Sequence, residues 1–175
     1  MDEYSFRMRP YNRLAAVRYA QKWAYGRNPR FYDYEHIGGD CTNFASQCVY
    51  AGSGVMNYTK DFGWYYIDAN NKAPAWTGVD YFFQFMTRKE ENAGPVALEA
   101  SIGQLEPGDV VQLSFDGESW NHSPVVVRLL RTPALRPADV LIAAHSYDSD
   151  NRPLSTYDYR GIRFLHFIGV RAPVQ

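Results

Sequence analysis

The sequence has few cysteines, and their spacing argues against a bridge between them. There are two cysteines in 175 residues, too few for a disulfide framework or for a zinc site built from thiolates. Cys41 and Cys48 lie seven positions apart. On a helix that spacing is about two turns, which is farther than a disulfide can reach. We therefore expect two free thiols.

Long apolar runs and clusters of basic residues are also absent. No stretch approaches the roughly 18 apolar residues that a membrane-spanning helix needs. The net charge is -1 with no run of Lys or Arg, whereas nucleic-acid binding draws on a clustered basic surface. We therefore expect neither a membrane nor a nucleic acid as a partner.

The first residues, MDEYSFRMRPYNRL, carry charge where a signal peptide needs an apolar block. This pattern predicts either a cytosolic protein or one whose leader has been removed, and it leaves the compartment open.

The composition that remains is that of a globular protein. Hydrophobic residues make up 46% and charged residues 21%, which is enough apolar material for a core. The length fits one domain, so we expect a single domain over residues 1–175 that acts as a monomer. Aromatic residues reach 16%, led by Tyr. Most of them are expected in the core or at its rim, although tyrosines also suit a groove for an extended, polar substrate.

The first half of the chain predicts helices. Apolar residues recur at helical spacing in three segments, residues 11–23, 41–51 and 80–90. Asp40 precedes the second helix as an N-cap, and Gly52 ends it. The aromatic segment between the second and third helices, residues 55–75, is interpreted as an irregular excursion beside the groove.

The second half predicts strands. Turns at Pro107-Gly108 and Asp116-Gly117 separate β-rich runs at residues 109–115, 123–130, 140–146 and 162–170. Helices followed by strands predict an α+β fold, in which N-terminal helices pack on a C-terminal antiparallel β-sheet.

Cys41 is the candidate nucleophile. A thiolate attacks a carbonyl, so a catalytic cysteine needs surroundings that lower its pKa. The first position of a helix offers unpaired N–H groups and a favourable dipole, and the same amides can hold an oxyanion. We expect the pKa of Cys41 to fall below the free-thiol value of about 8.5. The alternative is a small buried residue on a helix face, which is our interpretation of Cys48.

His122 is the candidate base. It opens the strand at residues 123–130, and His145 ends the strand at residues 140–146. If these strands form a hairpin, both rings lie at one end of the sheet, where His145 can orient His122. Asp148 and Asn121 compete for that third role.

The two other histidines are given different roles. We interpret His36 as exposed or groove-lining, and His166 as structural or surface. His122, His145 and a nearby Asp could ligate zinc, but no HExxH or paired-Cys spacing supports this. We therefore expect neither a metal nor another cofactor.

Several motifs together resemble one known family. The block DCTNFASQC at residues 40–48 is the most specific of them. The others are Tyr11-Asn12-Arg13 with Ala20 and Trp23, Trp76-Thr77 with Val79, Leu105 with Pro107-Gly108-Asp109, His122-Ser123, and His145 with Asp148. From Tyr11 to Asp148 the chain resembles the bacterial putative amidase domain family, which looks like a branch of the papain-like fold related to NlpC-type cell-wall peptidases.

The resemblance implies roles for these residues. Cys41 would be the nucleophile, His122 the base and His145 the third member, as in Cys-His-His triads. Tyr32 resembles a tyrosine that some of these enzymes keep beside the nucleophile, with Tyr34 as the alternative. We place Tyr32, Asp40 and Asp148 on the substrate-binding side of the site. Pro124 departs from the family's pattern and predicts an edge or a bulge.

The expected activity follows from this resemblance. We predict a cysteine-dependent amidase or peptidase that hydrolyses amide bonds through an acyl-enzyme, with peptidoglycan peptides as the substrate class. One alternative is a non-catalytic module that binds cell-wall peptide or a protein in the same groove. Another is an acyl transferase, in which an amine replaces water.

Overall fold

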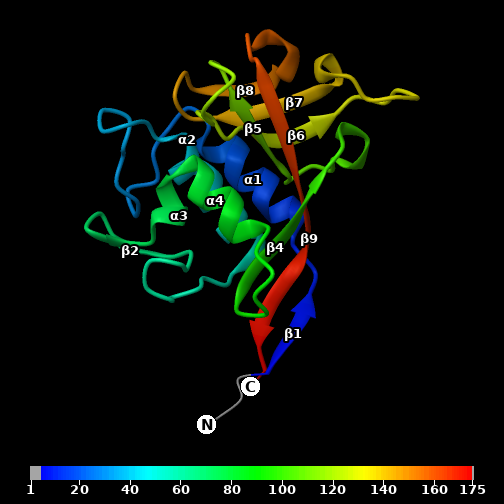
Figure 1. The fold of residues 1–175 in the computed structure, drawn as a ribbon. Coiled ribbons are helices and arrows are strands. Elements are labelled where there is room, and N and C mark those ends of the chain that lie inside the picture. Colours follow the sequence, from blue (N-terminus) through cyan, green and yellow to red (C-terminus); the bar gives the residue numbers. More distant parts are fainter. Residues whose placement is uncertain (1–4, 175) are drawn as a thin grey trace.

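The computed structural model describes residues 5–174, and within them the chain has an α+β architecture. Helices cover one face of a seven-stranded sheet whose paired strands are all antiparallel (Figure 1). The predicted arrangement of helices on an antiparallel sheet is therefore confirmed.

Four helices form the helical layer: α1 (Arg13–Trp23), α2 (Cys41–Ser53), α3 (Pro74–Thr77) and α4 (Val79–Met86), counted within the described residues. The Asn12 side chain caps α1 by accepting a hydrogen bond from the Ala15 amide at 3.0 Å. Helix α2 runs past the predicted stop at Gly52 and ends at Gly54, whose φ of 66° suits glycine. Gly52 instead allows close packing, because a Cβ there would overlap the Tyr11 ring.

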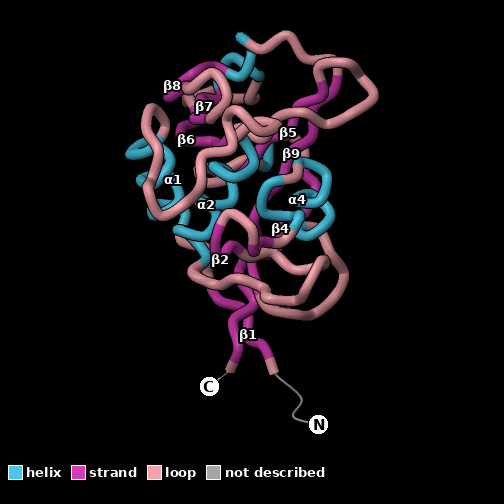
Figure 2. The backbone as a smooth tube through the Cα atoms, turned by 90° about the vertical axis from the view of Figure 1, so that its left-hand side faces the viewer, coloured by secondary structure: helices cyan, strands magenta, loops and turns pink. Residues whose placement is uncertain are grey.

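The main sheet has the order β1-β9-β5-β6-β7-β8, and β4 also pairs with β9. Its strands are β1 (Phe6–Arg9), β4 (Gly94–Ala100), β5 (Val110–Ser114), β6 (Val125–Leu129), β7 (Val140–Ala144), β8 (Ser149–Pro153) and β9 (Gly161–Pro173). A small separate hairpin joins β2 (Tyr66–Asp68) to β3 (Asn71–Lys72). The long strand β9 runs the height of the molecule, and β1 lies beside its C-terminal end (Figures 1 and 2).

The hairpin of β6 and β7 is confirmed. Val125 pairs with Ala143, so His122, ahead of β6, and His145, just after β7, follow the chain to the same end of the sheet. An isolated bridge joins Leu113 to His122 before β6 begins. This bridge keeps the register of the Val110–Val125 pair, and the Val111 amide donates to the Pro124 carbonyl at 2.9 Å. The edge or bulge that Pro124 predicted is therefore wrong, because the pairing passes Pro124 without a register shift and β6 is an interior strand.

The sheet buries apolar side chains on both faces. Val125, Val127, Leu141 and Ala143 face the helices and belong to the main core, together with Phe44 and Cys48 of α2 and other buried residues. Their neighbours Val126, Ile142 and Ala144 point to the opposite face, into a smaller core with Leu154. This alternation is the period of two that places successive strand residues on opposite faces. The smaller core lies under three short 3-10 turns, η1 (Ile102–Gln104), η2 (Pro137–Asp139) and η3 (Leu154–Thr156).

Two of the sequence motifs bind each other across the molecule. Arg13 donates to the Asp109 carboxylate at 2.8 Å and to the Phe167 carbonyl at 2.6 Å. Asp109 is fully buried, and it also accepts hydrogen bonds from the Phe167 amide and from His166. Tyr11 donates to the carbonyl of Gly108 at 2.8 Å. The Tyr-Asn-Arg and Pro-Gly-Asp motifs therefore join α1 to β5 and β9.

Some elements differ from the sequence prediction. Strands β1, β4 and β8 and the β2–β3 hairpin were not predicted. The aromatic segment that follows α2 was interpreted as lying beside the groove, yet Trp64 is fully buried and its indole packs on Trp76 with ring centroids 4.8 Å apart. Trp64, Tyr65 and Tyr66 thus belong to the core, whereas Tyr58 and Phe62 of the same segment are exposed.

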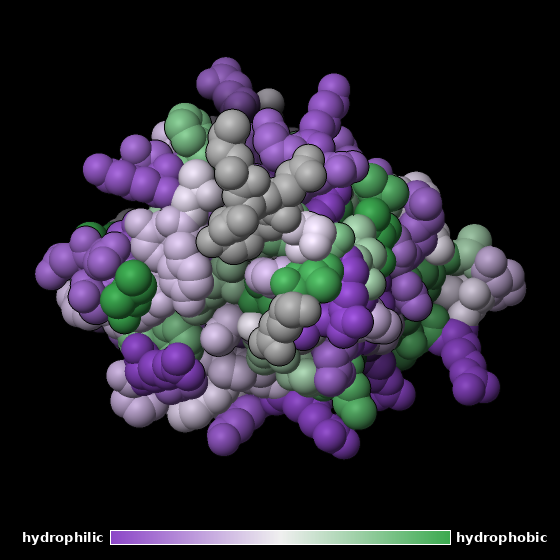
Figure 3. Space-filling view, turned by 90° about the horizontal axis from the view of Figure 1, so that it is seen from below, coloured by the Kyte–Doolittle hydropathy of each residue, from purple (hydrophilic) through white to green (hydrophobic). Residues whose placement is uncertain are grey.

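The surface shows no helix suited to a bilayer. Within the described part of the chain, every helix is too short or too polar to cross a membrane. Figure 3 looks at the end of the molecule below β1. Where described residues are uncovered there, hydrophobic side chains lie in separate small patches among hydrophilic ones.

Candidate functional site

The start of α2 places Cys41 at a helix N-terminus. Cys41 is the first residue of the helix and is buried, with 8% of its surface exposed. Asp40 occupies the N-cap position, but its side chain makes no capping hydrogen bond. Instead the carboxylate accepts from the Tyr34 amide and from the Asn43 side chain. The first N–H groups of a helix have no partner within the helix, so those of α2 can meet a ligand.

The sulfur of Cys41 faces the segment that carries His122. Sγ lies 3.8 Å from the carbonyl oxygen of Asn121 and 3.7 Å from the hydroxyl of Thr42. That hydroxyl is in turn 3.1 Å from the hydroxyl of Ser123. The two motifs on either side of the site are therefore hydrogen-bonded to each other.

Cys41 and His122 open into the same cavity, whose volume is about 750 Å³. It is lined by Gly38, Gly39, Cys41, Phe115, Asn121, His122, Ser146, Tyr147, Arg152, Tyr157 and Asp158. Both glycines have positive φ, 87° and 99°, which is a backbone conformation that other residues rarely adopt. They bring the backbone before α2 up to the cavity wall. The sequence thus predicted correctly that Cys41 and His122 lie near each other.

The expected lowering of the Cys41 pKa is wrong for the resting protein. Burial raises the pKa of the Cys41 thiol, and the nearby Asp40 carboxylate adds to the rise. Hydrogen bonds from Thr42 and from the Ser123 amide act in the opposite direction without reversing it. The helix N-terminus alone would lower the pKa of the thiol, but the loss of water around the sulfur outweighs this effect. At neutral pH the resting group is therefore a thiol.

His122 is also uncharged in the resting protein. It is buried, with 4% exposure, and burial together with the charge of Arg152 lowers its pKa from 6.5 to about 4. Its Nε2 lies 3.2 Å from the hydroxyl of Tyr157. Among residues 5–174, the hydrogen bonds of Cys41 include none to the His122 ring. Attack by the thiol would thus need the ring and the sulfur to come closer.

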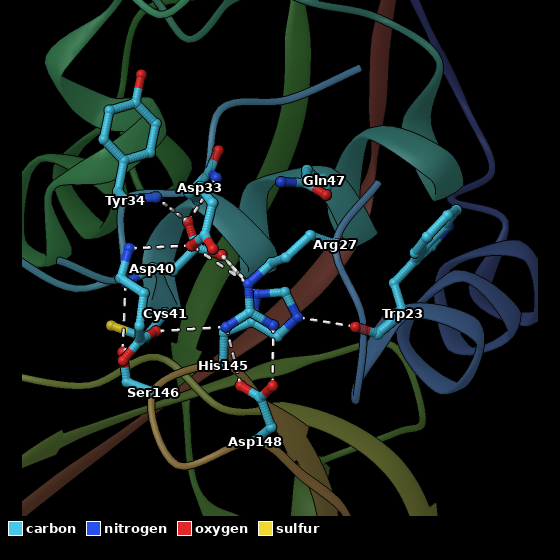
Figure 4. Close-up of polar contacts among 12 residues, drawn as sticks. Trp23, Arg27, Asp33, Tyr34, Asp40, Cys41, Gln47, His145, Ser146 and Asp148 are labelled. Atoms are coloured by element: carbon cyan, nitrogen blue, oxygen red, sulfur yellow. Dashed lines mark hydrogen bonds and ion pairs between the residues drawn. The ribbon is translucent and has the colours of Figure 1, made fainter. Parts of the chain in front are cut away.

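His145 does not orient His122 as expected. Its Nδ1 lies 2.5 Å from the Asp40 carboxylate, and its Nε2 lies 2.8 Å from the carbonyl oxygen of Trp23. Both partners are hydrogen-bond acceptors, so the His145 ring links the Asp40 carboxylate to the end of α1. The ring is buried and stacks on Phe44, with centroids 4.0 Å apart. In Figure 4 the sulfur of Cys41 points away from it. The group that contacts His122 is Tyr157.

Asp148 also differs from its predicted role. It holds Arg27 through two hydrogen bonds, at 2.9 and 3.1 Å, and Arg27 lies between Asp148 and Asp40 in Figure 4. Asp33 and Glu35 also form ion pairs with Arg27. This cluster ties the loop before α2 to the turn after β7, so Asp148 supports the site from behind the cavity.

The turn after β7 carries a cavity residue in an unusual conformation. Ser146 and Tyr147 both have positive φ, 61° and 59°, which is costly for residues other than glycine. The Ser146 hydroxyl accepts from the Asp40 amide at 3.3 Å and donates to Glu35 at 3.2 Å. Tyr147 is 90% exposed at the cavity rim.

The remaining predicted residues lie as follows. Asp40 is fully buried and cannot reach a substrate. Tyr32 is 46% exposed and is not among the cavity residues, whereas Tyr34 is buried. Asn121 lines the cavity, and its side chain donates to Ser119. His36 is exposed, and Cys48 is a fully buried free thiol in the main core.

The polar residues of the DCTNFASQC block form buried hydrogen bonds that hold the helix carrying Cys41. Asn43 accepts from the Trp76 indole at 3.0 Å. Ser46 donates to the Trp76 carbonyl and accepts from Trp64. Gln47 accepts from Tyr19 at 2.5 Å. Buried polar groups are costly without such partners, which explains why Asn43 and Trp76 recur in motifs that lie far apart in sequence.

Six cavity residues were not predicted from the sequence: Phe115, Ser146, Tyr147, Arg152, Tyr157 and Asp158. The chain contains 14 tyrosines, and nothing in the local pattern sets Tyr157 apart. Only the closing of η3 against β8 brings it to His122. The zinc alternative finds no ligand set, because no group of three His, Cys, Asp or Glu side chains in residues 5–174 is placed to hold a metal ion.

Fold and site together define an α+β protein with a cysteine at a helix N-terminus and a histidine beside it at the end of a sheet. The chain belongs to the putative amidase domain family, whose sequence profile matches residues 10–168. It is 32% identical over 151 residues, or 85% of its length, to the uncharacterized protein YhbB of Bacillus subtilis (strain 168). The chain spans 45% of the length of YhbB. No solved structure matches it. The family's description indicates an amidase-type hydrolase.

Proposed function

We propose that the protein is a cysteine-dependent amidase in which Cys41 attacks an amide carbonyl and His122 accepts the thiol proton. The observation that carries this proposal is that Cys41, the first residue of α2, and His122 line one cavity. A buried cysteine elsewhere on the helix, such as Cys48, has no such neighbours. A thiol beside a base and beside free N–H groups is the combination that acyl transfer needs.

The reaction starts from a neutral thiol and a neutral imidazole. The Sγ–H proton moves to His122 while Sγ bonds to the amide carbon, and the carbonyl electrons move to the oxygen. The N–H groups at the start of α2 stabilise that oxyanion. The C–N bond then breaks, and the departing amine takes the proton from His122. Water attacks the thioester with His122 again as base, which releases a carboxylate and restores the thiol.

Tyr157 is proposed to hold His122 in the required tautomer. The base must accept the proton at Nδ1, so Nε2 must carry hydrogen and donate it to the Tyr157 oxygen, 3.2 Å away. The Tyr157 oxygen can accept this hydrogen bond while keeping its own hydrogen, because burial raises the pKa of Tyr157. Tyr157 would thus take the positioning role that the sequence gave to His145.

The fold and the substrate class are part of the same proposal. Helices packed on an antiparallel sheet, with the cysteine on a helix and the histidine at a strand start, suit the papain-like arrangement of NlpC-type peptidases. The cavity combines aromatic walls from Phe115, Tyr147 and Tyr157 with polar groups, as an extended and polar peptide requires. We propose peptidoglycan peptides as the substrate class.

The test is digestion of purified peptidoglycan and its soluble muropeptides, with fragments identified by mass spectrometry. Wild-type protein should release new amine and carboxylate ends. Cys41→Ala should reduce the rate at least about 1,000-fold, because the nucleophile is lost. Cys48→Ala, on the same helix, should keep most of the activity. Equal loss in the two variants, with both folded by circular dichroism, would rule out the proposed division of roles.

A second candidate function is a binding module on the same cavity. It is favoured by the raised pKa of Cys41 and by the His122 ring bonded to Tyr157 rather than to the sulfur. This candidate predicts saturable muropeptide binding with no product and no thioester. An amine added to the digestion separates hydrolysis from acyl transfer, because transfer would give the amide of that amine.

A further inference from the structure

Arg152 stands at the cavity with its charge available. It lies on β8 and lines the same cavity as Cys41 and His122. Its charge reaches the base, since it contributes to the electrostatic surroundings of His122. The mechanism above gives Arg152 no role in the transfer of protons. A cation in this position has to be explained by something that enters the cavity.

The guanidinium is held in a fixed position. Its central carbon lies 3.7 Å from the centre of the Tyr157 ring. Nε donates to the Thr156 hydroxyl at 2.7 Å, and Nη2 donates to the Thr156 carbonyl at 3.3 Å. A guanidinium has five N–H donors in a planar fork, and these bonds use two of them. Because the Arg152 side chain is already ordered, it loses less conformational entropy when a ligand binds to it.

Arg152 forms no ion pair with any carboxylate of the described residues. Arg13, Arg27, Arg136 and Arg163 each form an ion pair. Within residues 5–174, Arg152 has no acidic oxygen within 4.0 Å. Asp158 borders the cavity too but is exposed and makes no such pair. Arg152 thus lacks the acidic partner that these four arginines have.

We propose that Arg152 is the receptor for a carboxylate of the substrate, so that the cavity selects peptides bearing a carboxylate close to the scissile amide. This inference rests on the proposed function, because it takes the ligand of the cavity to be the acyl substrate of Cys41. Planar guanidinium and carboxylate groups pair through two parallel hydrogen bonds, which gives direction as well as strength. The carboxylate belongs either to a chain terminus or to an acidic side chain.

The experiment uses alkylating reagents that carry the two kinds of carboxylate. Bromoacetyl-glycine is compared with bromoacetyl-glycine amide for the terminal carboxylate. For the side-chain carboxylate, bromoacetyl-glutamic acid amide is compared with bromoacetyl-glutamine amide. Labelling of Cys41 is followed by mass spectrometry of its peptide, and each ratio of acid to amide rates is divided by the same ratio for glutathione. No turnover is needed, so the result is independent of hydrolysis.

The proposal expects a normalised ratio of about 10 to 100 in wild-type protein for at least one pair, as a charged hydrogen bond provides. The pair that shows it identifies the source of the carboxylate. Arg152→Gln should bring the ratio to about 1, Arg152→Lys should keep part of it, and Arg128→Gln, which removes an exposed charge from β6, should leave it unchanged.

Should Arg152→Gln fail to fold, protection of wild-type Cys41 gives the answer. Acetyl-glycine or acetyl-glutamic acid amide should slow labelling by iodoacetamide, while acetyl-glycine amide and acetyl-glutamine amide should not. Ratios near 1 for both pairs in wild-type protein, or an equal fall in Arg128→Gln, overturn the carboxylate receptor. If peptidoglycan digestion persists in that case, the amidase proposal stands without it. A preserved ratio with no digestion overturns only the hydrolase.

Discussion

Burial, more than the charge of either group, sets the pKa values of the Cys41 and His122 side chains. Desolvation raises the pKa of the thiol and lowers that of the imidazole to about 4, so each is uncharged across the neutral range. A thiolate–imidazolium pair would hold two charges in a site that disfavours both. A neutral pair also has its base ready above about pH 4, because His122 then has an unprotonated ring nitrogen whose lone pair can accept the thiol proton.

The lowered pKa of His122 predicts a pH-dependent stability. In the unfolded chain the ring titrates at the ordinary value of 6.5, and in the folded protein at about 4. Between these values the unfolded state binds the proton more readily, so acidification favours unfolding. The free energy of unfolding should be unaffected by this group above pH 6.5 and should fall by about 3 kcal/mol on going down to pH 4.

Urea denaturation from pH 4 to 7.5 measures this effect. In His122→Gln, which cannot titrate, the acid-side loss should be smaller than in wild-type protein by that amount. Parallel curves for the two proteins would contradict the description of His122 as a buried, neutral ring.

Among the single residues, the sequence identified the nucleophile more readily than its surroundings. Cys41 follows two glycines at a helix start, whereas Cys48 lies on the apolar face of the same helix, and this contrast can be read from spacing. Tyr157 and Arg152 could not be found in this way, because their roles depend on how β8 and η3 fold back over β6. For His145, the position at a strand end was predicted correctly, but the hydrogen-bond partners were not.

The junction between α1 and α2 is the element-level feature that holds the site. The His145 ring contacts the Trp23 carbonyl at the end of α1 and the Asp40 carboxylate at the start of α2. An anion at a helix N-terminus is favoured by the helix dipole. The pair therefore fixes the start of α2 and keeps the Asp40 carboxylate away from the first-turn amides.

Because His145 holds this junction, we expect its substitution to lower the stability of the protein rather than to act directly on catalysis. His145→Gln removes the ring that pairs with the Asp40 carboxylate and leaves this carboxylate buried without it, which should lower the free energy of unfolding by about 3–5 kcal/mol. Asp80→Asn, which removes an exposed partner of Arg163, should cost under about 1 kcal/mol. Urea denaturation at pH 7 gives both values. A stable His145→Gln protein with lost activity would instead support His145 as a member of the catalytic group.

The elements differ in how visible they are in the sequence. Helices α1 and α2 and strands β5, β6, β7 and β9 carry clear helical or strand patterns, and they were predicted within a few residues. Strand β8 (SDNRP) has almost no apolar residue, and β1 has four residues that are largely exposed. Such strands form because a neighbour offers a free edge, here β7 and β9. The local sequence pattern of such a strand does not predict that pairing.

For the molecule as a whole, the class of fold could be predicted because helix patterns precede strand patterns along the chain. The contacts between distant segments that hold the fold together could not be predicted. The Arg13 to Asp109 pair and the Asn43 to Trp76 hydrogen bond join segments far apart in sequence, and only the folded structure shows why these residue types are required. The single cavity that combines Cys41, His122 and Arg152 is a result of these links.

The most direct test of the account is the rate at which iodoacetamide labels Cys41 between pH 4 and pH 10, in wild-type protein and in His122→Gln. If His122 serves Cys41 as a base, wild-type labelling at pH 7 should be at least about tenfold faster than in His122→Gln. The wild-type rate should rise toward an inflection above the free-thiol value of about 8.5, since burial raises the pKa of this thiol. Cys48 should stay almost unlabelled in both proteins. Equal Cys41 rates in the two proteins over the whole range would contradict the partnership of Cys41 and His122.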